Sequence, residues 1–157
     1  MEDKTQLALD TFATICMALD ENDWKYKKDG ENLVIECGAQ GDDLPMDLTI
    51  KVDARRQFVM LFSRMPFVIQ EDKRLDMAVA VSAVNNALAD GCFDYDVLTG
   101  RMYFRMTNTF MESKMDREVF TYMLYCSCQT IDEYNDKFLM LAKGMLDMEK
   151  FLAAVMN

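Results

Sequence analysis

Residues 93–107, FDYDVLTGRMYFRMT, alternate large apolar with polar side chains on both sides of a short turn. Alternation with a period of two places successive side chains on opposite faces of a β-strand. Two such segments joined by a glycine-containing turn are typical of an antiparallel hairpin. The stretch therefore commits the chain to an antiparallel sheet, and it says more about the fold than about the function.

Further strand patterns precede this hairpin. We expect strands at about residues 24–27, 33–37, 46–53 and 57–63. The segment 46–53 alternates apolar and polar residues, which indicates one face in contact with water. The segment 57–63 is apolar on both sides, which is typical of a strand in the centre of a sheet or of one covered on both faces.

Apolar residues also recur at helical spacing. We expect helices at about residues 5–20 and 75–88, a long helix that starts at a capping box in 113–116, and a short one at 146–155. Residues 75–88 are apolar around the whole circumference, so this helix needs cover on more than one side, from the rest of the chain or from a second subunit. The order helix, strands, helix, hairpin, long helix predicts an α+β fold with helices packed on an antiparallel sheet.

Composition limits the possible partners. A length of 157 residues with 51% hydrophobic residues suits one domain, which we expect to span residues 1–157. The formal charge of −10 repels a phosphate backbone, so we expect no nucleic-acid partner. The same charge favours basic proteins or peptides, although it also serves solubility alone. Without a secretion-signal pattern or an apolar run of about 18 residues, we expect a cytoplasmic protein with no membrane partner.

Histidine is absent, which removes the commonest general base and metal ligand. An enzyme is therefore disfavoured, although a lysine in a pocket or a pair of carboxylates can act instead. Asp94 and Asp96 fall on one face of the expected hairpin, where they suit acid–base chemistry or a cation site. A solvated hairpin face explains both residues without a reaction. We favour that interpretation and expect no cofactor.

Five cysteines are present, and Cys126 and Cys128 invite a redox interpretation. Residues two apart on a helix point about 200° away from each other, so these thiols cannot form a disulfide while the helix persists. We favour reduced thiols in the core, and a thiol sensor is the weaker alternative.

Fifteen methionines are many for one domain, and their flexible side chains suit a surface that accepts varied partners. Met46, Met60, Met102 and Met106 lie on apolar strand faces, where filling of the core is the simpler interpretation.

Six residues are candidate partner contacts. Tyr122 and Met140 lie opposite Ile131 on the expected long helix, on the side that should face water. Four others combine aromatic and basic character on expected strands, where they should cover an edge of the sheet: Trp24, Tyr26, Tyr103 and Arg105. We expect Arg105 to pair with a nearby carboxylate.

Residues 85–107 also carry a likeness to a known family, through Asn85-Asn86, FDYD at 93–96, Gly100 and YFR at 103–105. These residues, and the ending from Gly144 to Phe151 after the long helix, resemble the YbjN family, a bacterial family to which regulation of sensory transduction is attributed. The element order resembles the type III secretion chaperone-like fold. One difference is that four strands are expected before the second helix, where those chaperones have three.

The resemblance implies an architecture and no active site, because the family is tied to no known reaction. Secretion chaperones of this fold are acidic homodimers that hold an extended segment of a client protein. We therefore expect a non-enzymatic interaction domain or chaperone-like regulator, homodimeric, that binds a partner protein or a peptide segment.

Overall fold

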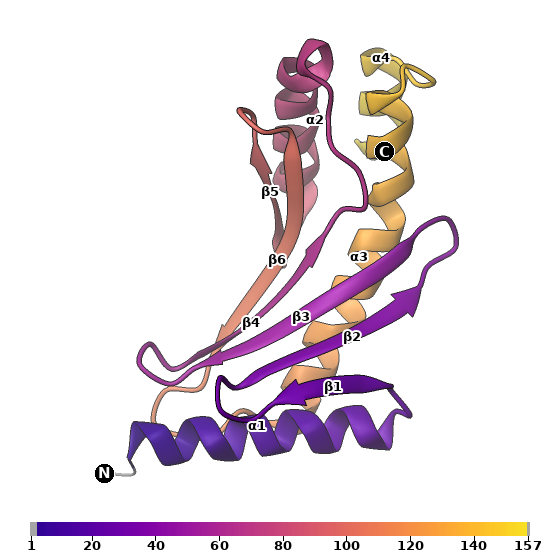
Figure 1. Cartoon of the computed structure of the whole chain (residues 1–157). Coiled ribbons are helices and arrows are strands. Elements are labelled where there is room, and N and C mark those ends of the chain that lie inside the picture. The colour runs from indigo at the N-terminus through magenta and orange to yellow at the C-terminus, as the bar shows by residue number, and fades with distance from the viewer. Residues whose placement is uncertain (1–2, 157) are drawn as a thin grey trace.

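Figure 1 shows the computed structural model of the chain, which describes residues 3–156. Its helices are α1 (Lys4–Glu21), α2 (Arg74–Ala87), α3 (Arg117–Ala142) and α4 (Met148–Val155), with a short 3₁₀ helix η1 (Glu71–Lys73) before α2. Its strands are β1 (Tyr26–Asp29), β2 (Val34–Gln40), β3 (Pro45–Asp53), β4 (Phe58–Arg64), β5 (Cys92–Asp96) and β6 (Arg101–Thr109). This is the predicted α+β order, with four strands before α2. Within residues 3–156, no helix combines the length and the hydropathy that a membrane crossing needs.

The strands form one antiparallel sheet in the order β1-β2-β3-β4-β6-β5. β4 is central, as predicted, and pairs with β3 on one side and β6 on the other. The β5–β6 hairpin therefore joins the first four strands through β6, and β1 and β5 form the two edges. Gly100 in the hairpin turn has a φ of 73°, which glycine adopts without strain, and its carbonyl accepts the Ile69 N–H at 2.9 Å.

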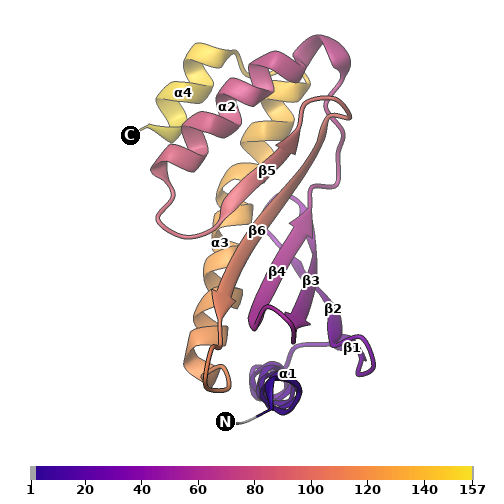
Figure 2. The same cartoon turned by 90° about the vertical axis from the view of Figure 1, so that its left-hand side faces the viewer.

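The sheet is covered by helices on one face. In Figure 1, α3 passes behind β2 and β3, and in Figure 2 the helices α2, α3 and α4 lie together on one side of the strands. The face toward α3 contributes alternate buried residues such as Ile50, Leu61 and Met106, which lie next to one another in register. These residues join residues of all four helices in one hydrophobic core. We call the opposite face, which no described helix covers, the open face.

An aromatic cluster joins the hairpin to the C-terminal helices. The ring of Phe93 on β5 packs edge-on against Phe104, Tyr134 and Phe138, with ring centroids 5.2, 6.1 and 5.1 Å apart. Phe138 in turn packs on Phe151 of α4 at 5.6 Å. Phe138 is fully buried, so this one side chain ties β5, α3 and α4 together.

The start of α3 corrects one prediction. The N-cap is Asp116, whose carboxylate accepts the N–H groups of Glu118 at 2.7 Å and Val119 at 3.3 Å. Ser113 lies in the preceding bend and is not the cap. The predicted capping box was wrong because Asp116 itself provides the capping oxygen.

The exposure of α2 also differs from what its sequence predicts. α2 buries Met77, Ala80 and Val84 on the side that faces β5 and α4. Leu75 and Val79 are 77% and 55% exposed. The rest of the chain therefore covers α2 on one side and does not provide the second cover that its apolar circumference predicts.

Two smaller predictions also need correction. Trp24 precedes β1 and lies outside the strands. Met60 is not in the core, because alternation along β4 turns it to the open face, whereas Met46, Met102 and Met106 are buried as predicted.

Candidate functional site

The open face carries large apolar side chains along the central strand. Phe58, Met60 and Phe62 alternate on β4 with the buried Val59 and Leu61, so they point away from the core, and each remains half-buried. We call these three residues the β4 row. In Figure 2 the side of the strands that is opposite the helices lies open. A central strand therefore presents side chains typical of a core to the outside of the molecule.

Polar and charged side chains border the β4 row on both neighbouring strands. Lys51 of β3 and Thr107 of β6 lie opposite Met60, and Arg105 of β6 lies opposite Phe62. An apolar centre with a polar rim is the common layout of surfaces that bind other proteins.

The open face is close to neutral, although the chain has a formal charge of −10. The strand positions that point outward carry five cations and six anions, a net charge of −1: Lys27, Lys51, Arg64, Arg101 and Arg105 against Asp29, Glu36, Asp47, Asp53, Asp94 and Asp96. The negative charge of the protein therefore lies mostly elsewhere, and the β4 row is set in a surface that repels neither acidic nor basic partners strongly.

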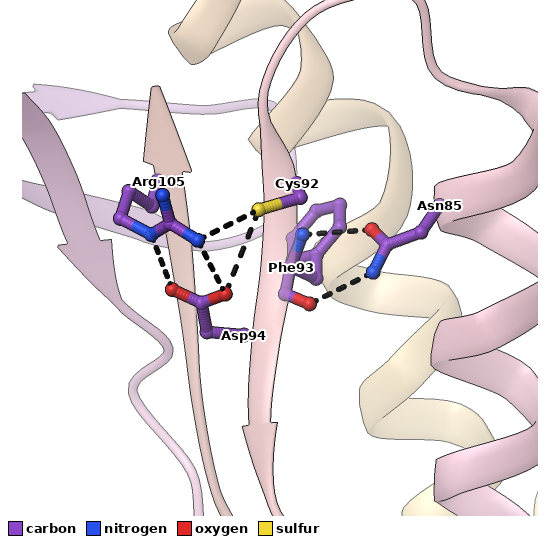
Figure 3. Close-up of polar contacts among 5 residues, drawn as sticks. All are labelled: Asn85, Cys92, Phe93, Asp94 and Arg105. Atoms are coloured by element: carbon purple, nitrogen blue, oxygen red, sulfur yellow. Dashed lines mark hydrogen bonds and ion pairs between the residues drawn. The ribbon is translucent and has the colours of Figure 1, made fainter. Parts of the chain in front are cut away.

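Arg105 is held at the border of the β4 row by Asp94 of β5 (Figure 3). Its Nε donates to Asp94 Oδ2 at 2.6 Å and its Nη2 donates to Oδ1 at 3.0 Å, while Nη2 also contacts Cys92 Sγ at 3.4 Å. The hydrogen bonds from Arg105 lower the pKa of Asp94 and raise the pKa of Arg105. The predicted pairing of Arg105 with a carboxylate is confirmed. Arg105 favours the ionised form of Asp94 and bonds both of its carboxylate oxygens.

Asp96 has a separate role in the hairpin turn. Its Oδ1 accepts the Leu98 N–H at 2.9 Å and its Oδ2 accepts the Thr99 hydroxyl at 2.7 Å. The bond from Thr99 is the main reason that the pKa of Asp96 is lowered. Asp94 and Asp96 thus belong to different hydrogen-bond groups, and the structure does not favour them as an acid–base pair. Among residues 3–156, no three Cys, Asp or Glu side chains gather to hold a metal ion.

Asn85 of α2 occupies the outer edge of β5 (Figure 3). Its Nδ2 donates to the carbonyl oxygen of Phe93 at 2.9 Å, and its Oδ1 accepts the Phe93 N–H at 2.8 Å. One side-chain amide takes the place that the main chain of a further strand would occupy. These two bonds also fix α2 against the sheet.

Exposed apolar side chains also occur on α2 and at the neighbouring tip of the hairpin. Leu75 and Val79 of α2 are exposed, as are Val97 and Leu98 at the tip of the hairpin, at 39% and 82%. Arg74 links the two elements, because its Nη1 donates to the carbonyl oxygen of Leu98 at 2.6 Å. We call Leu75, Val79, Val97 and Leu98 the α2 patch.

Two of the predicted partner contacts lie far apart on α3. Tyr122 is 56% exposed, and its hydroxyl donates to Asp90 Oδ2 at 2.5 Å. This bond raises the pKa of Tyr122 to about 12. Met140 is half-buried, and the helical rise places it about 27 Å from Tyr122. The structure does not bring these residues into one site.

The other four predicted contacts divide between two places. Trp24 and Tyr26 pack against the core, and the Tyr26 hydroxyl donates to Asp20 of α1 at 2.9 Å. Tyr103 and Arg105 lie on the open face, on the strand next to β4. Sequence reasoning missed the β4 row itself, although the apolar character of residues 57–63 on both sides was the signal that pointed to it.

The described cysteines are all free thiols. Burial raises the pKa of Cys37 to about 12 and that of Cys128 to about 11. Sensor thiols need an accessible thiolate, so Cys37 and Cys128 do not fit a thiol sensor.

We expect native Cys128 to react with iodoacetamide at pH 8 roughly 100-fold more slowly than an ordinary exposed thiol, because its raised pKa leaves about one hundredth of the thiolate. Mass spectrometry of the labelled peptides measures this rate. The urea-unfolded chain is the control and should react at the ordinary rate. Equal rates in the two states would show that the fold does not suppress the thiolate.

Comparison with known proteins identifies the fold. No protein-family model and no curated protein matches the sequence. The crystal structure of YbjN from E. coli is similar, with a TM-score of 0.57 and 14% identity over 79% of this chain and 90% of that one. The ExsC–ExsE complex is also similar, with a TM-score of 0.58 and 14% identity over 87% of this chain and 96% of that one. The HopA1–SchA chaperone–effector complex has a TM-score of 0.49 and 12% identity, over 92% of this chain and 97% of that one. The chain has the predicted YbjN-like, type III secretion chaperone-like fold.

Proposed function

We propose that this chain is a non-enzymatic, chaperone-like regulatory protein that binds a partner protein or a segment of one. The observation that carries the proposal is the β4 row, which sets Phe58, Met60 and Phe62 on an uncovered face. Complete burial of such a side chain is worth roughly 1.5–3 kcal/mol, and a half-buried one retains part of that gain for a partner. The fold supports the proposal, because one similar structure is a complex of two proteins.

The candidate reactive groups support a binding role over an enzyme. Asp94 is paired with Arg105, and Asp96 closes the hairpin turn. Both carboxyl groups have a lowered pKa, whereas a general acid needs a raised one.

The proposal includes a homodimer built through the α2 patch. Leu75 and Leu98 are 77% and 82% exposed, and Arg74 holds their two elements together. An apolar patch on one helix and a neighbouring turn can meet its own copy across a two-fold axis, which is the commonest symmetry of oligomers. The dimer would also provide the second cover that the sequence of α2 demands.

We expect the wild-type chain to have twice its chain mass of 18.2 kDa in light scattering, and Val79→Asp to shift it to the single-chain mass. A charge inside an apolar interface must be desolvated, which weakens association by several kcal/mol. Met17→Asp is the matched control, because Met17 is 56% exposed on α1, close to the 55% of Val79. A monomeric wild type at tens of micromolar, or a dimer that survives Val79→Asp, would contradict this interface.

Affinity purification of the tagged chain from its own cells, followed by mass spectrometry, tests the proposed function. We expect a small set of proteins to be retained by the wild type and lost with Met60→Glu, which places a charge in the centre of the β4 row. Gln129→Glu is the control on the exposed side of α3 and should retain them. A wild type that retains no protein, or two variants that behave alike, would count against the proposal.

A further inference from the structure

We infer, resting on the proposed function, that the partner places an amphipathic helix on the β4 row and adds no strand to either edge of the sheet. A sheet can receive a peptide in two ways. An extended segment pairs with the main chain of an edge strand, whereas a helix lies on a face. The two edges and the open face of this chain differ in what they allow.

The edge at β5 is already occupied. Asn85 bonds both the N–H and the carbonyl of Phe93, at 2.8 and 2.9 Å, so these main-chain groups are not free for a new strand. α2 packs along the same strand, and Figure 2 shows it beside β5. A peptide that paired here would have to displace the helix.

The edge at β1 is also unfavourable for the addition of a strand, for a different reason. The strand has four residues, and Lys25, Lys27 and Lys28 in and beside it are exposed. Short edge strands rich in lysine discourage the addition of another strand. Tyr26 fastens β1 to α1 through its bond to Asp20, and Figure 1 shows α1 running beside this edge.

A segment that binds the face cannot use the main chain of the sheet. Its own N–H and carbonyl groups must then be satisfied within the segment, because main-chain groups buried without a partner cost free energy. A helix meets this condition within itself, whereas an extended segment meets it only by keeping its main chain in water, which leaves less of its apolar surface in contact with the β4 row. The inner face shows the same solution, since the helix α3 lies across it.

The spacing and charge of the open face define this helix further. Phe58 to Phe62 spans about 14 Å along β4 at the usual rise of a strand. Side chains at positions i, i+4 and i+8 of a helix span about 12 Å, so one apolar stripe of two to three turns matches the row. Lys51 lies directly opposite Met60 and makes no ion pair with the described residues. A carboxylate on the flank of the helix that faces β3 therefore complements the site.

Selection of peptides on the purified full chain tests the inference. The probe is a phage-displayed library of random 16-residue peptides, and the enriched peptides are synthesised and measured by fluorescence anisotropy. We expect apolar residues at helical spacing with an acidic flank. A hydrocarbon staple on the polar side, which fixes the helix, should tighten binding about tenfold. Met60→Glu should weaken binding at least about tenfold, and Lys51→Glu up to about fivefold. Met17→Asp, on the exposed side of α1, should leave it unchanged.

The outcomes separate this inference from the proposed function. Enriched peptides that lose binding when stapled, or that bind Met60→Glu as well as the wild type, would overturn the helix on the open face and leave partner binding intact. A selection that enriches no peptide would count against both.

Discussion

Phe138→Ala is expected to lower the free energy of unfolding by about 4 kcal/mol. Phe138 is fully buried, and its ring packs against Phe93 at 5.1 Å and Phe151 at 5.6 Å. Removing the ring leaves a cavity where β5, α3 and α4 meet. Phe93 of the hairpin and Phe151 of the last helix would both lose their ring contact with position 138, so the surroundings cannot close the gap with one small movement.

Urea unfolding followed by circular dichroism measures this loss, at one protein concentration for all variants. Gln129→Ala is the matched control on the exposed side of the same helix and should change the free energy of unfolding by less than about 0.5 kcal/mol. A loss below about 1 kcal/mol for Phe138→Ala would mean that the aromatic cluster does not hold these elements together.

Asn85→Ala is expected to lower the free energy of unfolding by about 3 kcal/mol. The substitution leaves the N–H and the carbonyl of Phe93 without partners, and each buried unsatisfied group costs about 1–3 kcal/mol. In a chain of this size, such a loss lowers the melting temperature by about 6–12 °C. Thermal unfolding of the purified variant measures the shift.

The neighbouring asparagine provides the control. Asn86 has the same side chain and is exposed, so Asn86→Ala should have little effect. Asn85→Asp keeps an acceptor for the Phe93 N–H but removes the donor for its carbonyl, so we expect it to be no more stable than Asn85→Ala. Equal melting temperatures for the Asn85→Ala and Asn86→Ala variants would show that the amide does not hold α2 on β5.

Periodicity along the sequence was sufficient to locate the strands and helices. The expected hairpin at 93–107 corresponds to β5 and β6, and the expected helix at 75–88 corresponds to α2. These patterns are local, because each residue's face is set by its neighbours in the same element. The boundary at Ser113 failed because two capping residues, Ser113 and Asp116, competed within one turn, and only contacts in three dimensions decide between them.

Periodicity cannot show what covers an apolar surface. Residues 57–63 and α2 are each apolar on two sides, and in both cases the chain covers one side and leaves the other open. The sequence indicates that cover is needed, and the structure shows which side lacks it. Met60 was assigned to the core for this reason, although it belongs to the open face.

Contacts between distant residues also escaped prediction. Asp94 and Asp96 share a face of one strand, but Arg105 pairs with the first and the turn at Thr99 uses the second. Asn85 mimics a strand only because α2 runs beside β5, which no local pattern predicts. The separation of the two carboxylates and the closing of the β5 edge therefore follow from the register of the sheet and the packing of α2.

Photo-crosslinking from the open face in the cells that make this protein tests the central claim most directly. A benzoylphenylalanine residue replaces Met60 in one variant and Gln129, on the exposed side of α3, in the other. We expect position 60 to form a crosslink to a protein other than this chain, and position 129 to form none. If position 60 yields no such product, or only the products that position 129 yields, the open face of the sheet is not the surface through which this protein works.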